Sequence, residues 1–125
     1  MYGDLVYVEL PIRLEKLDET FRFYQTLFDW KIQESFISKQ RYFVFQTPGK
    51  KLFGGFDSNL TPSIDNINLY IYVASIDETM KLIQDHFSKT TVLRPKTLIS
   101  PDDGSYALII DPSGNKIGIN EYIKP

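Results

Sequence analysis

Two stretches of the chain carry apolar residues at helical spacing, and each follows a stretch in which apolar and other residues alternate. The helical patterns cover residues 14–28 and 76–87, where apolar side chains recur three and four positions apart. Alternation over residues 6–12 and 68–74 is typical of a strand with one buried face. The pattern therefore predicts a strand followed by a helix, twice.

Three further strand-like runs follow each predicted helix. They are WKIQESFI (30–37), QRYFVFQT (40–47) and LFGGFD (52–57) in the first half, and TVLRPKTLI (91–99), SYALIID (105–111) and KIGINEYI (116–123) in the second. Turn residues separate them at Pro48-Gly49, Asp103-Gly104 and Pro112-Ser113-Gly114. Each half thus reads β-α-β-β-β, which predicts an α+β fold.

The two halves resemble one another in sequence. LDETF at 17–21 returns as IDETM at 76–80, and Phe28 falls on Phe87 in the same alignment. Chance similarity of two amphipathic helices would explain this match, but not the matching order of strands. We interpret the chain as a duplicated module, with module one over 1–60, a linker at 61–63, module two over 64–125, and all of 1–125 as a single domain. Ser75 and Glu78 predict a capping box at the second helix.

Composition excludes several classes of protein. The chain has 125 residues, 42% of them apolar, and a net charge of −2 with scattered basic residues, so no nucleic-acid or membrane partner is expected. The absence of cysteine excludes disulfides and thiolate chemistry. No run is long enough to span a membrane, and no signal peptide is recognisable at the N-terminus, so a cytoplasmic location is expected.

Two motifs carry a resemblance to a known family. FYQTLFDW (23–30) and DPSGNKIG (111–118), each at the expected place in a duplicated β-α-β-β-β frame, are similar to signatures of the vicinal oxygen chelate superfamily, which includes glyoxalases, bleomycin-resistance proteins and extradiol dioxygenases. The resemblance implies two modules that form an open barrel-like cleft, and a homodimer. It implies function only loosely, because that scaffold carries enzymes and binding proteins.

The resemblance also implies where a divalent ion would be held. Metal-dependent members use four side chains, and the corresponding positions here are occupied by Tyr7, Gly54, Asn68 and Gly118. None of these is a usual ligand, so no metal and no other cofactor is expected. Strand parity places Glu121 on the face opposite to Gly118, and His86 is expected as an exposed or half-packed residue at a helix end.

Alternation divides the strands into a core face and a cleft face. The predicted core residues are Val6, Val8, Leu10, Leu69, Ile71, Val73, Ile117 and Ile119. The other face is rich in aromatic side chains, which are typical of a small-molecule pocket. The predicted ligand-binding residues are Tyr7, Glu9, Phe56, Asn68, Tyr70, Tyr72, Asn120 and Tyr122. Alternatively, these tyrosines fill space between the modules or face a dimer partner.

Glu9 is the candidate catalytic residue. A carboxyl group among aromatic rings could act as a base or hold a cationic ligand, and the alternative is a hydrogen bond to Tyr70 or Asn120. The sequence therefore predicts a metal-free small-molecule-binding protein. Two alternatives remain, a metal-dependent lyase, isomerase or dioxygenase of the same superfamily, and a metal-independent enzyme that uses Glu9 as base.

Overall fold

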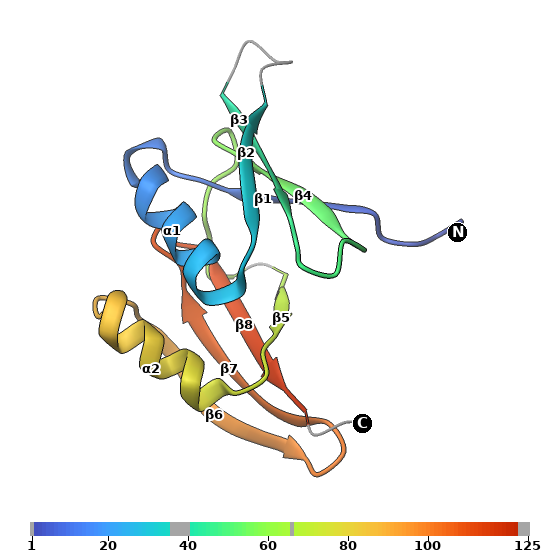
Figure 1. Ribbon diagram of the computed structural model, residues 1–125, viewed down its shortest axis with the longest axis vertical. Coiled ribbons are helices and arrows are strands. Elements are labelled where there is room, and N and C mark those ends of the chain that lie inside the picture. Colours follow the sequence, from blue (N-terminus) through green and yellow to red (C-terminus); the bar gives the residue numbers. More distant parts are fainter. Residues whose placement is uncertain (1, 36–40, 66, 123–125) are drawn as a thin grey trace. The chain divides into compact units, whose positions relative to one another are not determined.

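The computed structural model describes residues 2–35, 41–65 and 67–122. Contacts within the chain divide it into two compact units, residues 1–62 and 63–125. The order of elements is β-α-β-β-β in each unit, with a short 3-10 helix before the first α-helix, which confirms the predicted α+β fold (Figure 1). The predicted strand ends at 36–37, 40 and 123 lie outside the described residues.

The first unit is a four-stranded mixed sheet with one helix on it. Its strands lie in the order β1-β4-β3-β2, with β1 parallel to β4 and the other pairs antiparallel. The elements are β1 (Tyr7–Pro11), η1 (Leu14–Lys16), α1 (Leu17–Phe28), β2 (Lys31–Ser35), β3 (Tyr42–Gln46) and β4 (Phe53–Asp57).

Aromatic side chains form the core of the first unit. Tyr24 of α1 is fully buried and stacks on Trp30, whose ring lies 4.2 Å from that of Phe45 on β3. Phe21 of α1 lies edge-on to Phe43 of β3. Rings of this size bury large apolar areas, so α1 and the helix-facing side of the sheet stabilise one another.

The second unit repeats this topology. Its strands lie in the order β5-β8-β7-β6, with β5 parallel to β8. The elements are β5 (Tyr70–Tyr72), α2 (Ile76–His86), β6 (Val92–Ser100), β7 (Gly104–Ile110) and β8 (Lys116–Glu121). Aliphatic side chains replace the rings in this core, and those fully buried are Ile76, Ala107, Ile109, Ile117 and Ile119.

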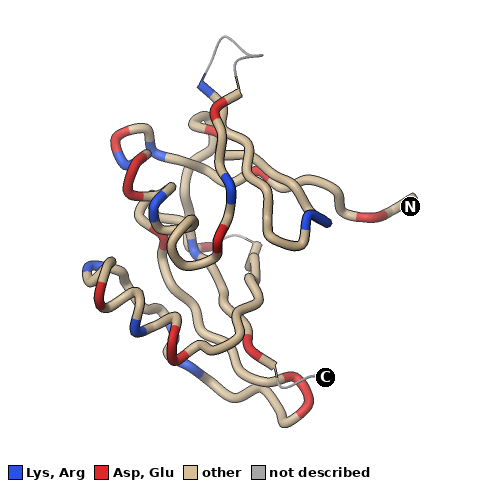
Figure 2. The backbone as a smooth tube through the Cα atoms, viewed as in Figure 1, with Lys and Arg blue, Asp and Glu red and all other residues tan. Residues whose placement is uncertain are grey.

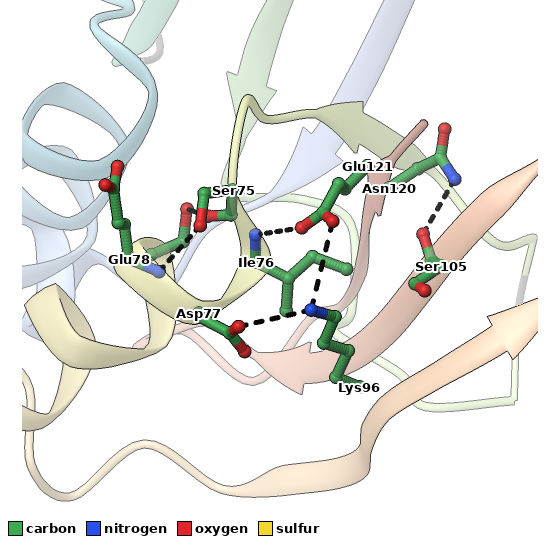
Figure 3. A network of polar contacts seen from close by, with 9 residues as sticks. Ser75, Ile76, Asp77, Glu78, Lys96, Ser105, Asn120 and Glu121 are labelled. Atoms are coloured by element: carbon green, nitrogen blue, oxygen red, sulfur yellow. Dashed lines mark hydrogen bonds and ion pairs between the residues drawn. The ribbon is translucent and has the colours of Figure 1, made fainter. Parts of the chain in front are cut away.

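The start of α2 is fixed by contacts from its own cap and from β8. The Ser75 hydroxyl accepts a hydrogen bond from the Glu78 amide, as the capping prediction requires. The Glu121 carboxylate accepts a hydrogen bond, 2.6 Å long, from the Ile76 amide. The Lys96 amine of β6 forms ion pairs with both Asp77 and Glu121 (Figure 3). Carboxylates at a helix N-terminus are also favoured by the helix dipole.

Acidic and basic residues are mixed along both units rather than gathered by sign (Figure 2). Among the described residues, no helix is long and apolar enough to cross a membrane.

Candidate functional site

The second unit contains a pocket of about 660 Å³ on the face of its sheet that points away from α2. This size is within the range of small-molecule sites. Tyr70, Tyr106 and Asn120 come from three neighbouring strands, and Tyr122 follows β8. The side chains that complete the lining belong to the end of β6 and the turn after it, and they are Ile99, Asp102 and Asp103.

The tyrosine rings of this face are placed in pairs. The rings of Tyr70 and Tyr106 lie 6.2 Å apart at 71° to one another, and those of Tyr72 and Tyr122 lie 4.8 Å apart at 49°. Tyr70 and Tyr122 line the pocket and are 47% and 40% exposed, whereas Tyr72, which was predicted to bind a ligand, is 57% exposed and does not line it. The pocket therefore offers aromatic faces in two orientations.

A glycine supports one of these rings. Gly118 of β8 lies opposite Tyr70, and a Cβ atom at Gly118 would clash with the Tyr70 ring. The glycine therefore allows the ring to lie flat against the strand. In the sequence, Gly118 stands where a metal-dependent relative would carry a ligand side chain. In the structure, the Tyr70 ring covers this position.

Strand parity on β8 is as predicted. Asn120 faces the pocket side, and its amide nitrogen donates a 2.9 Å hydrogen bond to the Ser105 carbonyl (Figure 3). Glu121 lies on the other face, where it binds the first turn of α2. Asn68 is exposed in the segment before β5 and does not line the pocket.

The first unit holds a polar cluster on the side of its sheet that faces away from α1. The Tyr42 hydroxyl of β3 donates a 2.7 Å hydrogen bond to the Glu9 carboxylate of β1. Tyr42 and Tyr7 have their hydroxyls 2.8 Å apart, and because the Tyr42 proton is directed at Glu9, Tyr7 is the donor of this second bond. Burial, and then the hydrogen bonds to Tyr7 and Glu9, raise the pKa of Tyr42 well above its usual range.

Two residues of the β4 strand were assigned to the wrong face. Phe56 is fully buried and lies 5.5 Å from Phe21 of α1, so the prediction that it faces a ligand is wrong. Gly54 shares that face, where a Cβ atom would meet the Phe45 ring, and Gly55 is the glycine beneath Tyr42. The register is displaced by one residue because two successive glycines give alternation no side chain to distinguish them.

The solvent exposure of two further side chains tests their predicted positions. Val6 was predicted to be core, but it precedes β1 and is 68% exposed. His86 is the last residue of α2 and is exposed, as predicted.

Several solved structures resemble this chain over nearly its whole length. TnmS3, an antibiotic binding protein from Streptomyces sp. CB03234, has a TM-score of 0.72 and 17% identity, covering 98% of this chain and 99% of that chain. A Sphaerobacter thermophilus member of the glyoxalase/bleomycin resistance protein/dioxygenase superfamily has a TM-score of 0.69 and 14% identity, covering 97% and 98%. The chain has the fold of this superfamily. The fosfomycin resistance protein FosX from Listeria monocytogenes is also similar, with a TM-score of 0.69, 18% identity and coverage of 98% and 94%.

The likeness to the superfamily fold is one of structure. The sequence matches no protein-family model. It likewise matches no curated protein. At sequence identities of 14–18%, these proteins and this chain share a fold. A shared fold does not establish a shared function, which depends on the side chains of the site.

The side chains at the four positions that the superfamily resemblance implies for a metal, Tyr7, Gly54, Asn68 and Gly118, are poor ligands for a divalent ion. Within residues 2–35, 41–65 and 67–122, no group of three or more His, Cys, Asp or Glu side chains lies close enough together to hold an ion. Glu9 has tyrosine hydroxyls as neighbours, and the last strand of each unit carries a glycine beneath a tyrosine. Neutral phenols are poor ligands for divalent ions.

The sequence did not predict five residues that belong to the pocket of the second unit or to the hydrogen-bonded cluster around Glu9. They are Tyr42, Ile99, Asp102, Asp103 and Tyr106. Alternation along the strands could have placed two of them on the face opposite to the core. Tyr42 precedes the buried residues Phe43 and Phe45 at odd spacing, and Tyr106 does the same before Ala107 and Ile109. Asp103 was assigned correctly to a turn, which also includes Asp102, but nothing in a turn sequence shows that it borders a pocket.

Proposed function

We propose that this protein binds a small organic molecule in the tyrosine-lined pocket of its second unit and that it needs no metal ion to do so. The observation that carries the proposal is the pocket itself, in which three tyrosines, one amide and two carboxylates surround about 660 Å³. Aromatic walls supply apolar area, and a few polar groups fix the orientation of a ligand. The structural likeness to TnmS3, an antibiotic binding protein, supports binding as an activity of this fold.

Ligand binding is tested by nuclear magnetic resonance screening of a library of aromatic and aliphatic fragments. Binding fragments are expected to shift the amide signals of Tyr106, Asn120 and neighbouring residues. Tyr106→Ala should weaken binding about tenfold, because it removes one wall of the pocket. Tyr2→Ala is the matched control, since Tyr2 is fully exposed and does not line the pocket. Shifts confined to residues outside the pocket would contradict the proposal.

The metal-free part is tested separately by elemental analysis of protein purified without chelators and then titrated with manganese, nickel or zinc. We expect well under one ion per chain, because the described residues offer no suitable group of ligands. One manganese, nickel, zinc or iron ion per chain would sink this part and favour a metal-dependent enzyme.

Glu9 is the residue on which a metal-independent reaction would depend. Its Oε2 atom accepts a hydrogen bond from the Tyr42 hydroxyl, which gives the carboxylate a structural role within the first sheet. Because this role needs no substrate, binding without catalysis is our preferred function. Glu9→Gln should leave ligand affinity in the second unit unchanged, and loss of a measurable turnover in this variant would favour the enzyme instead.

We further propose a homodimer, which the superfamily resemblance implies. Tyr7, Val44 and Phe53 leave apolar area exposed on one face of the first sheet, and such area favours association. Sedimentation velocity at micromolar concentration should give twice the mass of 14.5 kDa, whereas a single species at that mass would refute the dimer.

A further inference from the structure

The pocket of the second unit carries negative charge without a basic partner in its lining. Asp102 and Asp103 are both exposed at the β6–β7 turn, and the seven described lining residues include no lysine, arginine or histidine. Lys96 of β6 is already engaged, because its amine lies 3.2 Å from Asp77 and 3.9 Å from Glu121 at the start of α2. The carboxylates of the pocket are thus available to a charged ligand.

The turn that carries these carboxylates is fixed. Ser100 donates a 2.9 Å hydrogen bond to Oδ2 of Asp103 and accepts one from the Asp103 amide, also 2.9 Å long. Gly104 follows with a φ of 77°, and a Cβ atom there would clash with the Glu121 carbonyl, so the turn packs closely against the end of β8. The turn therefore holds Asp103 beside the pocket before any ligand arrives.

The rings next to this turn are suited to the same kind of ligand. The faces of tyrosine rings carry negative electrostatic potential and attract cations. Tyr70 and Tyr106 both line the pocket and stand at 71° to each other, so the two rings are oriented in different directions. Carboxylates and ring faces together favour a positive group, and the rings with the neighbouring Ile99 side chain favour an apolar body.

We propose that the pocket selects organic cations, namely molecules that combine an aromatic or other apolar body with an amine or quaternary ammonium group. This inference rests on the proposed binding function and adds the charge class of the ligand. The apolar body lies against Tyr70 and Tyr106, and the cationic group lies toward Asp102 and Asp103. Anions of the same shape are rejected by the two carboxylates.

Three probes of nearly equal shape test the inference: 2-naphthylmethylamine, 2-naphthylmethanol and 2-naphthoate, which are positive, neutral and negative at pH 7. Their affinities are measured by the amide shifts of Tyr106 and Asp103 in the full chain. The amine is expected to bind roughly tenfold more tightly than the alcohol at low salt, and the naphthoate most weakly. Added salt should narrow the difference between amine and alcohol.

Variants locate the source of the preference. Asp102→Asn and the double variant Asp102→Asn/Asp103→Asn should lower the affinity for the amine toward that for the alcohol and leave the alcohol unaffected. Asp85→Asn is the matched control, because Asp85 is exposed on α2 and its substitution removes the same charge away from the pocket. The single variant at Asp102 keeps the Ser100–Asp103 bonds and so remains informative if the double variant unfolds.

The possible results separate this inference from the function on which it rests. Equal binding of amine and alcohol, or a preference that survives in the double variant, overturns the selection of cations and leaves small-molecule binding intact. Failure of all three probes and of the fragment library to shift any pocket amide overturns both proposals. A preference for the amine that is lost in Asp102→Asn but kept in Asp85→Asn supports both.

Discussion

The hydroxyl of Tyr42 donates a 2.7 Å hydrogen bond to the carboxylate of Glu9, and this bond joins two strands that are not neighbours in the first sheet. The strand between them is β4, and its Gly55 provides the space, because any side chain there would meet the Tyr42 hydroxyl. Tyr7 extends the chain of hydrogen bonds. The most chemically suggestive residue of the sequence, Glu9, is thus part of a small structural network.

Tyr42→Phe removes the donor of this network and is expected to lower the free energy of unfolding by about 1 kcal/mol at pH 7. The difference from wild type should shrink above pH 10. In the folded protein the raised pKa keeps Tyr42 protonated, whereas in the unfolded chain it ionises near its ordinary value of 10. Stability from this group is therefore present below pH 10 and lost as the pH rises beyond it.

Urea unfolding of both proteins at pH 7 and at about pH 11 measures this difference. Tyr2→Phe serves as the control, because Tyr2 is fully exposed. A difference between wild type and Tyr42→Phe that stays constant or grows above pH 10 would contradict the assignment.

The adjacent glycines of β4 should respond unequally to alanine. At Gly54 the new Cβ atom would meet the Val8 carbonyl and the Phe45 ring, which is buried and stacked on Trp30, so neither neighbour can move away. We expect Gly54→Ala to destabilise the fold by about 3 kcal/mol or to prevent folding. Gly55→Ala displaces only the end of the Tyr42 side chain and should cost about 1 kcal/mol, close to Tyr42→Phe.

Thermal and urea unfolding of the two variants give the comparison directly. In the combined variant with Tyr42→Phe, Gly55→Ala should cost less than it does alone, since the hydroxyl it displaces has gone. If Gly55→Ala were the more damaging of the two, the placement of Gly54 on the buried face of β4 would be wrong.

Much of the fold was predictable from the sequence because each module repeats the same periodicities. The helices, the order of strands and the turns follow from local patterns that the core then enforces, as the isoleucines of β8 show. Local patterns failed at Gly54-Gly55, where no side chain marks the face, and at Val6, which lies beyond the end of the strand.

The pocket was predictable only in part. Tyr70, Asn120 and Tyr122 were expected to bind a ligand and do line the pocket, whereas Tyr106 and the turn at Asp102-Asp103 were not expected there. Their role depends on which strands become neighbours, and β7 lies beside β8 only after the sheet has formed. Pairing of strands is a non-local property that one sequence does not display.

Gly118→Ala should alter the pocket without unfolding the protein. The added Cβ atom would clash with the Tyr70 ring, but that side chain is 47% exposed and can rotate toward solvent. We expect a stability loss of about 1 kcal/mol or less and a clear fall in affinity for 2-naphthylmethylamine, because one aromatic wall is displaced. In a Tyr70→Ala background the same substitution should have no further effect on affinity, and an undiminished effect there would show that Gly118 acts by another route.

Asp111 is expected to be the most important polar residue for stability in the DPSGN turn. Its Oδ1 atom accepts hydrogen bonds from the amides of Ser113, Gly114 and Asn115, each 2.9 Å long, and the carboxylate is almost entirely buried. Asp111→Ala removes these three bonds at once and leaves the Gly114 amide only its 3.0 Å bond to the backbone carbonyl of residue 111, so we expect a loss of about 3 kcal/mol in the free energy of unfolding.

Asp111→Asn keeps one acceptor oxygen and should lose less than Asp111→Ala, because the charge but not the turn geometry is removed. Asp57→Ala is a suitable comparison, since its carboxylate accepts only one described bond, from the Asn59 amide in an exposed turn. If Asp111→Ala lowered the free energy of unfolding no more than Asp57→Ala, the hydrogen bonds of the Asp111 carboxylate would not be what stabilises the turn. We expect instead that its carboxylate positions β8, and with it Asn120, beneath the pocket.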